Sequence, residues 1–160
     1  MIKKLLLGIF VLALILIACE RDDICATTTP TTPQLVIQFY DIENPSEAKS
    51  IVLAVNEVNN QDTLFYSQDT ILKVPLRTDA DQTIFNFTKN PGGELEDTDV
   101  VTFNYDTKEL YISRACGFRI SYDNLSTIYT PGNDTRWIDD LQIESQTITD
   151  EETTHINIYH

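Results

Sequence analysis

Two histidines and three cysteines are the residues of this chain best suited to nucleophilic or metal chemistry. They are His155, His160, Cys19, Cys25 and Cys116. Cys116 and a distant His155 would be a nucleophile and its base, but no local motif supports them. The two histidines are an odd number of positions apart, so on one strand they face opposite sides, and no third residue follows a metal-ligand spacing. We therefore expect no catalytic residue, no metal site and no cofactor.

Carboxylates gather in the segment 94–99, where four acidic side chains follow Gly92-Gly93. Calcium prefers several carboxylate oxygens on a turning backbone. The EF-hand spacing is missing, however, so a solvated loop is the preferred interpretation. Asp139 and Asp140 would point to opposite faces of a strand. A hydrolase that uses a carboxylate pair stays an alternative, because a sequence alone cannot pair carboxylates across a sugar.

Aromatic side chains offer a second kind of site, a platform on which sugar rings stack. The residues concerned are Tyr111, Tyr122, Tyr129 and Trp137. A single Trp in a β domain of this size usually fills the core, so burial is the preferred interpretation and a glycan-binding module is the alternative. Two triplets, Asp62-Thr63-Leu64 and Asp69-Thr70-Ile71, resemble acceptors for bacterial O-glycosylation and would mark surface loops.

The N-terminus carries the clearest targeting signal. Lys3 and Lys4 precede an apolar run, Leu5 to Ala18, which ends at Cys19. This order is typical of a secretory signal peptide, and the run is shorter than the roughly 20 residues that a spanning helix needs. The segment Leu16-Ile17-Ala18-Cys19 resembles the lipobox of bacterial lipoproteins, in which the cysteine is acylated and becomes the first mature residue. We expect cleavage after residue 18 and lipidation of Cys19; an uncleaved anchor is the alternative.

Charge limits the partners of the mature chain. Without Lys3 and Lys4, nine basic residues face 25 acidic ones, a formal charge of −16. Nucleic-acid binding needs a basic patch, so no nucleic-acid partner is expected. Anionic head groups would also repel the chain, so the lipid must hold it to the membrane. A hydrophobic fraction of 42% is enough for one packed core.

If Cys19 carries lipid, Cys25 and Cys116 are left. In an oxidising compartment an even remainder favours a disulfide. Two buried thiols, or a reactive Cys116, are the other interpretations.

Three regions follow from composition. Residues 1–18 are the signal peptide, 19–33 an acidic and Thr/Pro-rich tether with an extended backbone, and 34–160 one domain. In that domain apolar residues alternate with polar ones, which predicts half-buried strands. The alternating sets are Leu35/Ile37/Phe39, Ile51/Leu53/Val55, Phe85/Phe87, Val101/Phe103/Tyr105, Phe118/Ile120/Tyr122, Leu141/Ile143 and Ile156/Ile158.

Turn signals separate these runs. Residues 105–110 read as a hairpin, and 90–93 and 129–134 read as loops. A capping pattern at Asn44-Pro45-Ser46-Glu47 predicts at most one short helix. We therefore expect an all-β fold, a single antiparallel β-sandwich that is immunoglobulin-like or similar, with a small β-barrel as the alternative.

The whole chain resembles an uncharacterised family of small lipoproteins of the Gram-negative envelope. The resemblance is carried by Cys19, Asp22-Asp23-Ile24-Cys25, Phe39-Tyr40-Asp41, Ser113-Arg114-Ala115-Cys116-Gly117-Phe118, Trp137 and the ending Ile156-Asn157-Ile158-Tyr159-His160. It brings no activity with it. It does imply that Cys25 pairs with Cys116.

A second resemblance concerns Glu20-Arg21-Asp22-Asp23, which is similar to the acidic signal that sends some lipoproteins to the cell surface. The chain is thus expected to be a lipid-anchored outer-membrane lipoprotein, with the cell surface preferred over the periplasmic face. Its expected role is that of a non-enzymatic binding or assembly module with an envelope protein or glycan as partner.

Overall fold

A computed structural model describes residues 24–58, 65–132 and 135–160. The predicted signal peptide, Cys19 and the acidic stretch 20–23 lie outside the described residues. The described residues form two compact units. The larger comprises Pro30–Leu110 and Arg119–His160, and the smaller contains residues 24–29 and Tyr111–Phe118.

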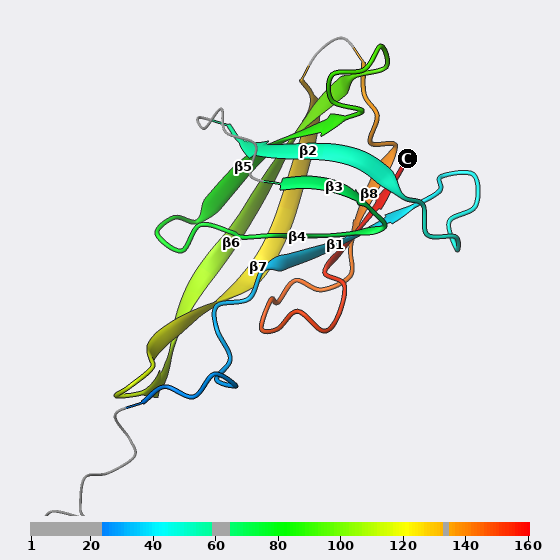
Figure 1. Cartoon of the computed structure of the whole chain (residues 1–160). Helices are drawn as coiled ribbons and strands as arrows, with labels where there is room; N and C mark the ends of the chain where they lie inside the picture. Colours follow the sequence, from blue (N-terminus) through cyan, green and yellow to red (C-terminus); the bar gives the residue numbers. More distant parts are fainter. Residues whose placement is uncertain (1–23, 59–64, 133–134) are drawn as a thin grey trace, which may run out of the picture. The chain divides into compact units, whose positions relative to one another are not determined.

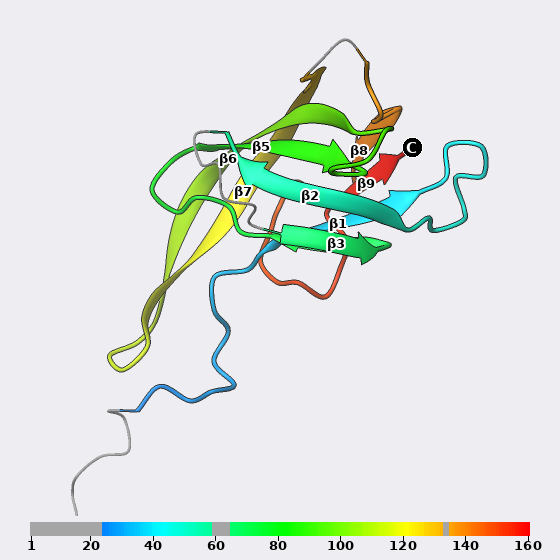
Figure 2. The ribbon, with the colours of Figure 1, turned by 45° about the horizontal axis from the view of Figure 1, so that its top comes forward.

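The described residues form strands and turns, with no helix among them. The strands are β1 (Leu35–Tyr40), β2 (Ile51–Glu57), β3 (Phe65–Asp69), β4 (Ile71–Val74), β5 (Gln82–Lys89), β6 (Asp97–Ser113), β7 (Gly117–Pro131), β8 (Asp140–Ile143) and β9 (Ile156–Tyr159). One sheet has the order β4-β1-β9-β8, and the other has the order β3-β2-β5-β6-β7 (Figure 1, Figure 2). The all-β prediction is confirmed, with two sheets as a sandwich requires.

The core lies between these sheets and is built by the predicted alternation. Inward positions of both sheets contribute to one cluster of buried side chains, which includes Leu35, Ile37, Phe39, Leu53, Val55, Phe85, Phe87, Val101, Phe103, Ile156 and Ile158. The rings of Phe85 and Phe103 meet edge to face, with centroids 6.1 Å apart. Alternation places every second side chain on one face of a strand, so a polar–apolar period of two becomes one solvated and one packed face.

One pair of neighbouring strands departs from the expected antiparallel arrangement. β1 and β9 run parallel, with Ile37 opposite Ile156 and Phe39 opposite Ile158. The register of β8 on β9 is antiparallel, as is that of β4 on β1. Parallel neighbours need a long connection, and the chain from β1 to β9 supplies one. The period of a strand carries no information about its direction, so the sequence could not show this pair.

The two sheets share a corner. Only Thr70 separates β3 from β4, although these strands belong to different sheets. The carbonyl oxygen of Thr70 accepts the backbone N–H of Phe39 at 2.8 Å, which continues the pairing of β1 into the corner. Of the two triplets that resemble O-glycosylation acceptors, Asp69-Thr70-Ile71 forms this corner. The other triplet, 62–64, lies outside the described residues.

The predicted hairpin at residues 105–110 is wrong. These residues continue β6, and the chain turns at 114–116, just before Gly117 with a φ of 70°. Asp106 uses its carboxylate to accept the side-chain amide of Asn124 at 2.6 Å, instead of forming a turn. A left-handed φ favours glycine because it lacks a Cβ. Turn chemistry at Asp106 is thus overridden by pairing with a distant residue.

Three smaller expectations are resolved by the backbone. Asn44–Glu47 forms a single turn closed by the Glu47 N–H on the Asn44 carbonyl (2.8 Å), so the short helix does not form. The loop at 90–93 is confirmed, with Gly92 at a φ of 76°. The loop expected from Tyr129 begins later, because β7 reaches Pro131.

Candidate functional site

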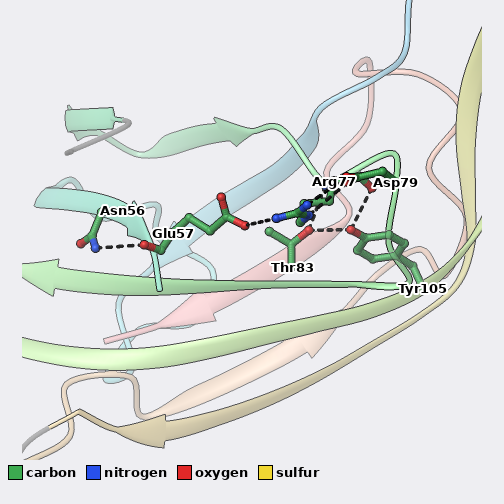
Figure 3. Close-up of polar contacts among 6 residues, drawn as sticks. All are labelled: Asn56, Glu57, Arg77, Asp79, Thr83 and Tyr105. Carbon is green, nitrogen blue, oxygen red and sulfur yellow. Dashed lines mark hydrogen bonds and ion pairs between the residues drawn. The ribbon is translucent and has the colours of Figure 1, made fainter. Parts of the chain in front are cut away.

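Arg77 is the centre of a polar cluster in the larger unit. It lies between β4 and β5, and its guanidinium forms two bonds with Asp79: Nε to Oδ1 at 3.1 Å and Nη2 to Oδ2 at 2.9 Å. A third bond joins Nη1 to Oε1 of Glu57, at the end of β2, over 3.2 Å (Figure 3). A bidentate guanidinium–carboxylate pair fixes both groups in one plane, so the cluster presents a set orientation despite its exposure.

The backbone of Arg77 is held by a closed cycle of hydrogen bonds. The Arg77 N–H donates to Oγ1 of Thr83 at 2.9 Å, and the Tyr105 hydroxyl donates to the Arg77 carbonyl at 2.9 Å. Thr83 Oγ1 and Tyr105 Oη are 2.5 Å apart, and since Tyr105 already donates to Arg77, Thr83 donates to Tyr105. Both side chains are buried, and Figure 3 shows the cycle beside the guanidinium. A satisfied buried network of this kind makes the loop rigid.

Two adjoining hollows open beside this cluster. The first, of about 290 Å³, is lined by Glu57, Val58, Arg77, Ala80, Asp81, Gln82 and Ile84. The second, of about 330 Å³, shares Asp81 and Gln82 and extends to Asn104, Tyr105, Asp106 and Asn124. We call Glu57, Arg77, Asp81, Gln82, Asn104, Asp106 and Asn124 the polar groove. Side-chain amides both donate and accept hydrogen bonds, so the groove suits a ligand rich in hydroxyl or amide groups.

The polar groove is braced across its strands. Gln82 Nε2 donates to Asn104 Oδ1 at 2.7 Å, which links β5 to β6. Asn124 Nδ2 donates to Asp106 Oδ2 at 2.6 Å, which links β7 to β6. Asn124 has a φ of 55°, a left-handed conformation that Asn tolerates better than most residues. Sequence reasoning missed this groove, because its members are spread from residue 57 to residue 124 and have no common spacing.

The electrostatic environment of Asp79 does not favour a role as a general acid. Hydrogen bonds from the Arg77 guanidinium hold the pKa of Asp79 below its usual value. A general acid needs the opposite shift. Asp99 has a raised pKa because its burial outweighs the hydrogen bonds from Ile138 and Trp137, but its side chain is 0% exposed. A carboxyl group that substrate cannot reach does not serve as a catalyst.

The segment 94–99 combines a surface loop with one core residue. Glu96 Oε2 accepts the backbone N–H of Gly92 at 2.5 Å, which closes the loop. Asp99 instead points into the core, where Oδ2 accepts the N–H groups of Trp137 and Ile138 at 3.0 and 2.8 Å. In the part of the chain that the structure describes, no group of three His, Cys, Asp or Glu side chains is placed to hold a metal ion.

Both histidines are buried rather than exposed at an edge. The Nδ1 atom of His155 accepts the backbone N–H of Val36 at 2.9 Å. The backbone N–H of His155 donates to the Val36 carbonyl, so His155 pairs with β1. His160 meets Phe39 and Trp137 edge to face, with centroids 6.1 and 5.9 Å apart.

Desolvation lowers the pKa of both imidazoles. Burial is the main cause for His155. For His160 burial acts together with the charges of Lys89 and Lys49 and lowers the pKa to about 4. Lys89 Nζ lies 3.4 Å from His160 Nδ1, and Lys49 Nζ donates to the His160 carbonyl at 2.7 Å. A neutral imidazole beside two ammonium groups is the consequence.

The aromatic residues divide between core and surface. Trp137 and Tyr122 are buried, and Trp137 Nε1 donates to the Phe87 carbonyl at 2.9 Å. The preferred interpretation of Trp137 as a core residue is confirmed. Tyr129 packs at the border of the core, with the Arg136 guanidinium 5.5 Å from its ring centroid. Tyr111 is exposed and belongs to the smaller unit, so the four rings do not make one sugar platform within the larger unit.

A disulfide joins Cys25 to Cys116 in the smaller unit, with an S–S distance of 2.05 Å. The pairing implied by the family resemblance is therefore present, and Cys116 has no free thiol with which to act as a nucleophile. The backbone N–H of Cys116 donates to Ser113 Oγ at 3.1 Å, and the Thr29 hydroxyl lies 3.6 Å from the Cys116 sulfur.

The second half of the tether is bound within the larger unit. The Ile120 N–H donates to Thr32 Oγ1 at 3.0 Å. Arg119 Nη1 reaches the carbonyls of Thr31 and Thr149 at 3.5 and 3.1 Å. The Gln34 N–H donates to Glu151 Oε1 at 2.9 Å. Residues 31–34 therefore form part of the packed domain.

These features define an all-β protein of two packed sheets with a disulfide-bridged N-terminal segment. Residues 49–160 match the Family of unknown function (DUF6452), and the chain belongs to this family. No curated protein and no solved structure matches the chain. Among the described residues, no helix is long and apolar enough to cross a membrane.

Proposed function

We propose that this protein is a lipid-anchored lipoprotein of the Gram-negative outer membrane that acts as a non-enzymatic binding or assembly module of the envelope. Cys19 carries the lipid, residues 1–18 are removed, and Glu20, Arg21, Asp22 and Asp23 direct the protein to the cell surface. The observation that carries the binding role is the polar groove, a concave surface of amide, carboxylate and guanidinium groups on rigid strands. Its chemistry favours a neutral, hydroxyl-rich ligand, such as an envelope glycan.

Two properties of the groove, and one of the neighbouring Asp79, support binding over catalysis. Arg77 is neutralised by two carboxylates, so the groove offers orientation rather than a strong field for an anion. The shift at Asp79 opposes general-acid chemistry. Hydrogen bonds across β5, β6 and β7 preorganise the amides, which lowers the entropy cost of holding a polar ligand.

Ligand binding is tested with the detergent-purified, full-length protein and polysaccharide isolated from the outer membrane of the source bacterium. Calorimetry should detect binding, and Gln82→Ala should weaken it about tenfold, since one lost hydrogen bond to a ligand costs about 1.4 kcal/mol. Gln142→Ala is the matched control. It too removes an exposed strand glutamine, which donates to Asp140 at 2.8 Å and accepts the Tyr159 hydroxyl at 3.5 Å, but in the other sheet. Equal affinities of the two variants, or release of shortened glycan, would argue against this role.

Anchoring has a separate test. Cells grown with an alkyne-tagged fatty acid should label the wild-type protein and not the Cys19→Ser variant. Antibody binding to intact cells then reports surface display. Absence of label on the wild type would remove the lipoprotein proposal, whereas label without antibody binding would place the protein on the periplasmic face.

A further inference from the structure

The smaller unit exposes apolar side chains to an unusual degree. Ile24 is 81% exposed, Tyr111 59% and Phe118 63%. The rings of Tyr111 and Phe118 pack edge to face with centroids 5.3 Å apart, so they form one patch rather than two isolated residues. A hollow of about 530 Å³ lies in the same unit, lined by Ile24, Ala26, Thr29, Tyr111, Ile112, Ser113, Arg114 and Cys116. We call this unit, residues 24–29 with 111–118, the bridged hairpin.

The charge of the bridged hairpin is opposite to that of the chain. Residues 24–29 and 111–118 contain no Asp or Glu and one charged side chain, Arg114, which is exposed. The whole chain carries a formal charge of −14. Anionic lipid head groups repel acidic surfaces and attract basic ones. The bridged hairpin is thus a part of the protein that an anionic membrane surface does not repel.

Covalent structure keeps this patch close to the proposed lipid. Cys25 lies six positions after Cys19, and six residues span at most about 20 Å whatever their conformation. The disulfide transfers this limit from Cys25 to Cys116, 91 positions further along the chain. Tyr111 and Phe118 therefore stay within reach of the bilayer surface at all times.

We propose that the bridged hairpin docks on the lipid bilayer in which the protein is anchored, with Ile24, Tyr111 and Phe118 inserted at the boundary between head groups and acyl chains. This inference rests on the lipid anchor of the proposed function. Aromatic side chains with a polar end prefer this boundary, and Arg114 extends its guanidinium to the phosphates while its methylenes remain in the apolar layer. The lipid supplies attachment, and the hairpin adds a second contact with the bilayer.

The test places a second tryptophan in the full-length, lipidated protein in phosphatidylcholine vesicles that contain phosphatidylglycerol. Phe118→Trp reports on the bridged hairpin. Ile128→Trp is the matched control, because Ile128 is 60% exposed on β7 in the larger unit. The native Trp137 is buried and gives a constant background. Lipids brominated near the carbonyl end of the acyl chain quench tryptophan at the expected depth of about 5–10 Å.

The proposal predicts that brominated lipid lowers the added emission of Phe118→Trp roughly twofold and leaves Ile128→Trp unchanged, as befits interfacial insertion. Tyr111→Ser in the Phe118→Trp background should reduce the quenching. Equal quenching of the two tryptophans in protein that floats with the vesicles would overturn hairpin docking and leave the anchor intact. Protein that does not float would overturn the anchor as well. A Phe118→Trp blue shift that depends on protein concentration without vesicles would identify a second copy of the chain as the occupant and overturn the proposal.

Discussion

The carboxylate of Asp99, fully buried on β6, accepts the backbone N–H of Ile138 at 2.8 Å. The same oxygen accepts the N–H of Trp137, so one side chain fixes the segment that leads into β8. Trp137 in turn donates to the Phe87 carbonyl on the neighbouring strand β5. A residue that looks like part of an acidic surface loop is therefore a structural bracket of the sandwich.

Asp99→Ala should cost about 3 kcal/mol of unfolding free energy. Two buried N–H groups lose their acceptor, and each unsatisfied group costs about 1–3 kcal/mol. Asp99→Asn keeps an acceptor oxygen and removes a buried charge, so its loss should be smaller. Urea-induced unfolding measures the loss for each variant, and the slope of the unfolding free energy against urea concentration should stay unchanged. Equal losses for the two variants would show that the carbonyl-type oxygen is not what holds the segment.

Stability should fall as the pH drops below about 6.5. In the unfolded chain both histidines bind a proton near pH 6.5, whereas in the folded protein the pKa of His160 is about 4 and that of His155 is also lowered. The unfolded state thus binds more protons in this window, and His160 alone removes up to about 3 kcal/mol between pH 6.5 and 4. Protonation of His155 also destroys the acceptor for Val36.

The measurement is the unfolding free energy at several pH values between 7.5 and 5, roughly the window in which histidine and not carboxylate titrates. His160→Phe keeps an aromatic ring against Phe39 and Trp137 and should flatten the pH dependence. A variant whose pH dependence matched the wild type would exclude His160 as the source.

Tyr105→Phe should destabilise the protein by about 1–2 kcal/mol, because the Arg77 carbonyl loses its donor and Thr83 loses its acceptor. Thr83→Val breaks the same cycle. The double variant should therefore cost less than the two single changes added together. Strict additivity in a urea-based double-mutant cycle would show that the cycle is not one unit.

Replacement of Cys25 and Cys116 by serine should lower the unfolding free energy by about 4–5 kcal/mol. The bridge closes a loop of 91 positions, and the chain-entropy treatment gives this magnitude for a loop of that length. Thermal unfolding with and without reductant supplies the internal control. Reductant should lower the melting temperature of the wild type towards that of the double-serine variant and leave the variant's melting temperature unchanged. A wild-type melting temperature that reductant does not change would contradict the expected stabilisation by the disulfide.

Much of the fold can be predicted from the sequence, because the burial of side chains along a strand follows the local alternation of apolar and polar residues. The alternation in Ile51, Leu53 and Val55 placed these side chains in the core, and the structure agrees. The same rule fails at Phe118, which continues the run to Ile120 and Tyr122 but is exposed. Phe118 belongs to the smaller unit, whereas Ile120 and Tyr122 belong to the larger one. A period of two does not show where along a strand the side chains leave the core.

The candidate site was not readable in this way. Arg77, Asn104 and Asn124 come together through strand pairing across three strands and a loop, and no local pattern connects them. The residue type of Asp106 predicts a turn, but in the structure its carboxylate accepts a hydrogen bond from Asn124. The parallel pair β1–β9 joins segments that are more than a hundred positions apart.

Residue types and short spacings are sufficient to predict the strand-rich composition, the apolar alternation of the core and the even pair of cysteines beyond Cys19. The burial of Asp99 and of both histidines, the path of β6 through residues 105–110 and the polar groove beside Arg77 arise only in the folded chain. These outcomes depend on desolvation and on hydrogen bonds between residues distant in the chain, and such partners exist only after the sheets have formed.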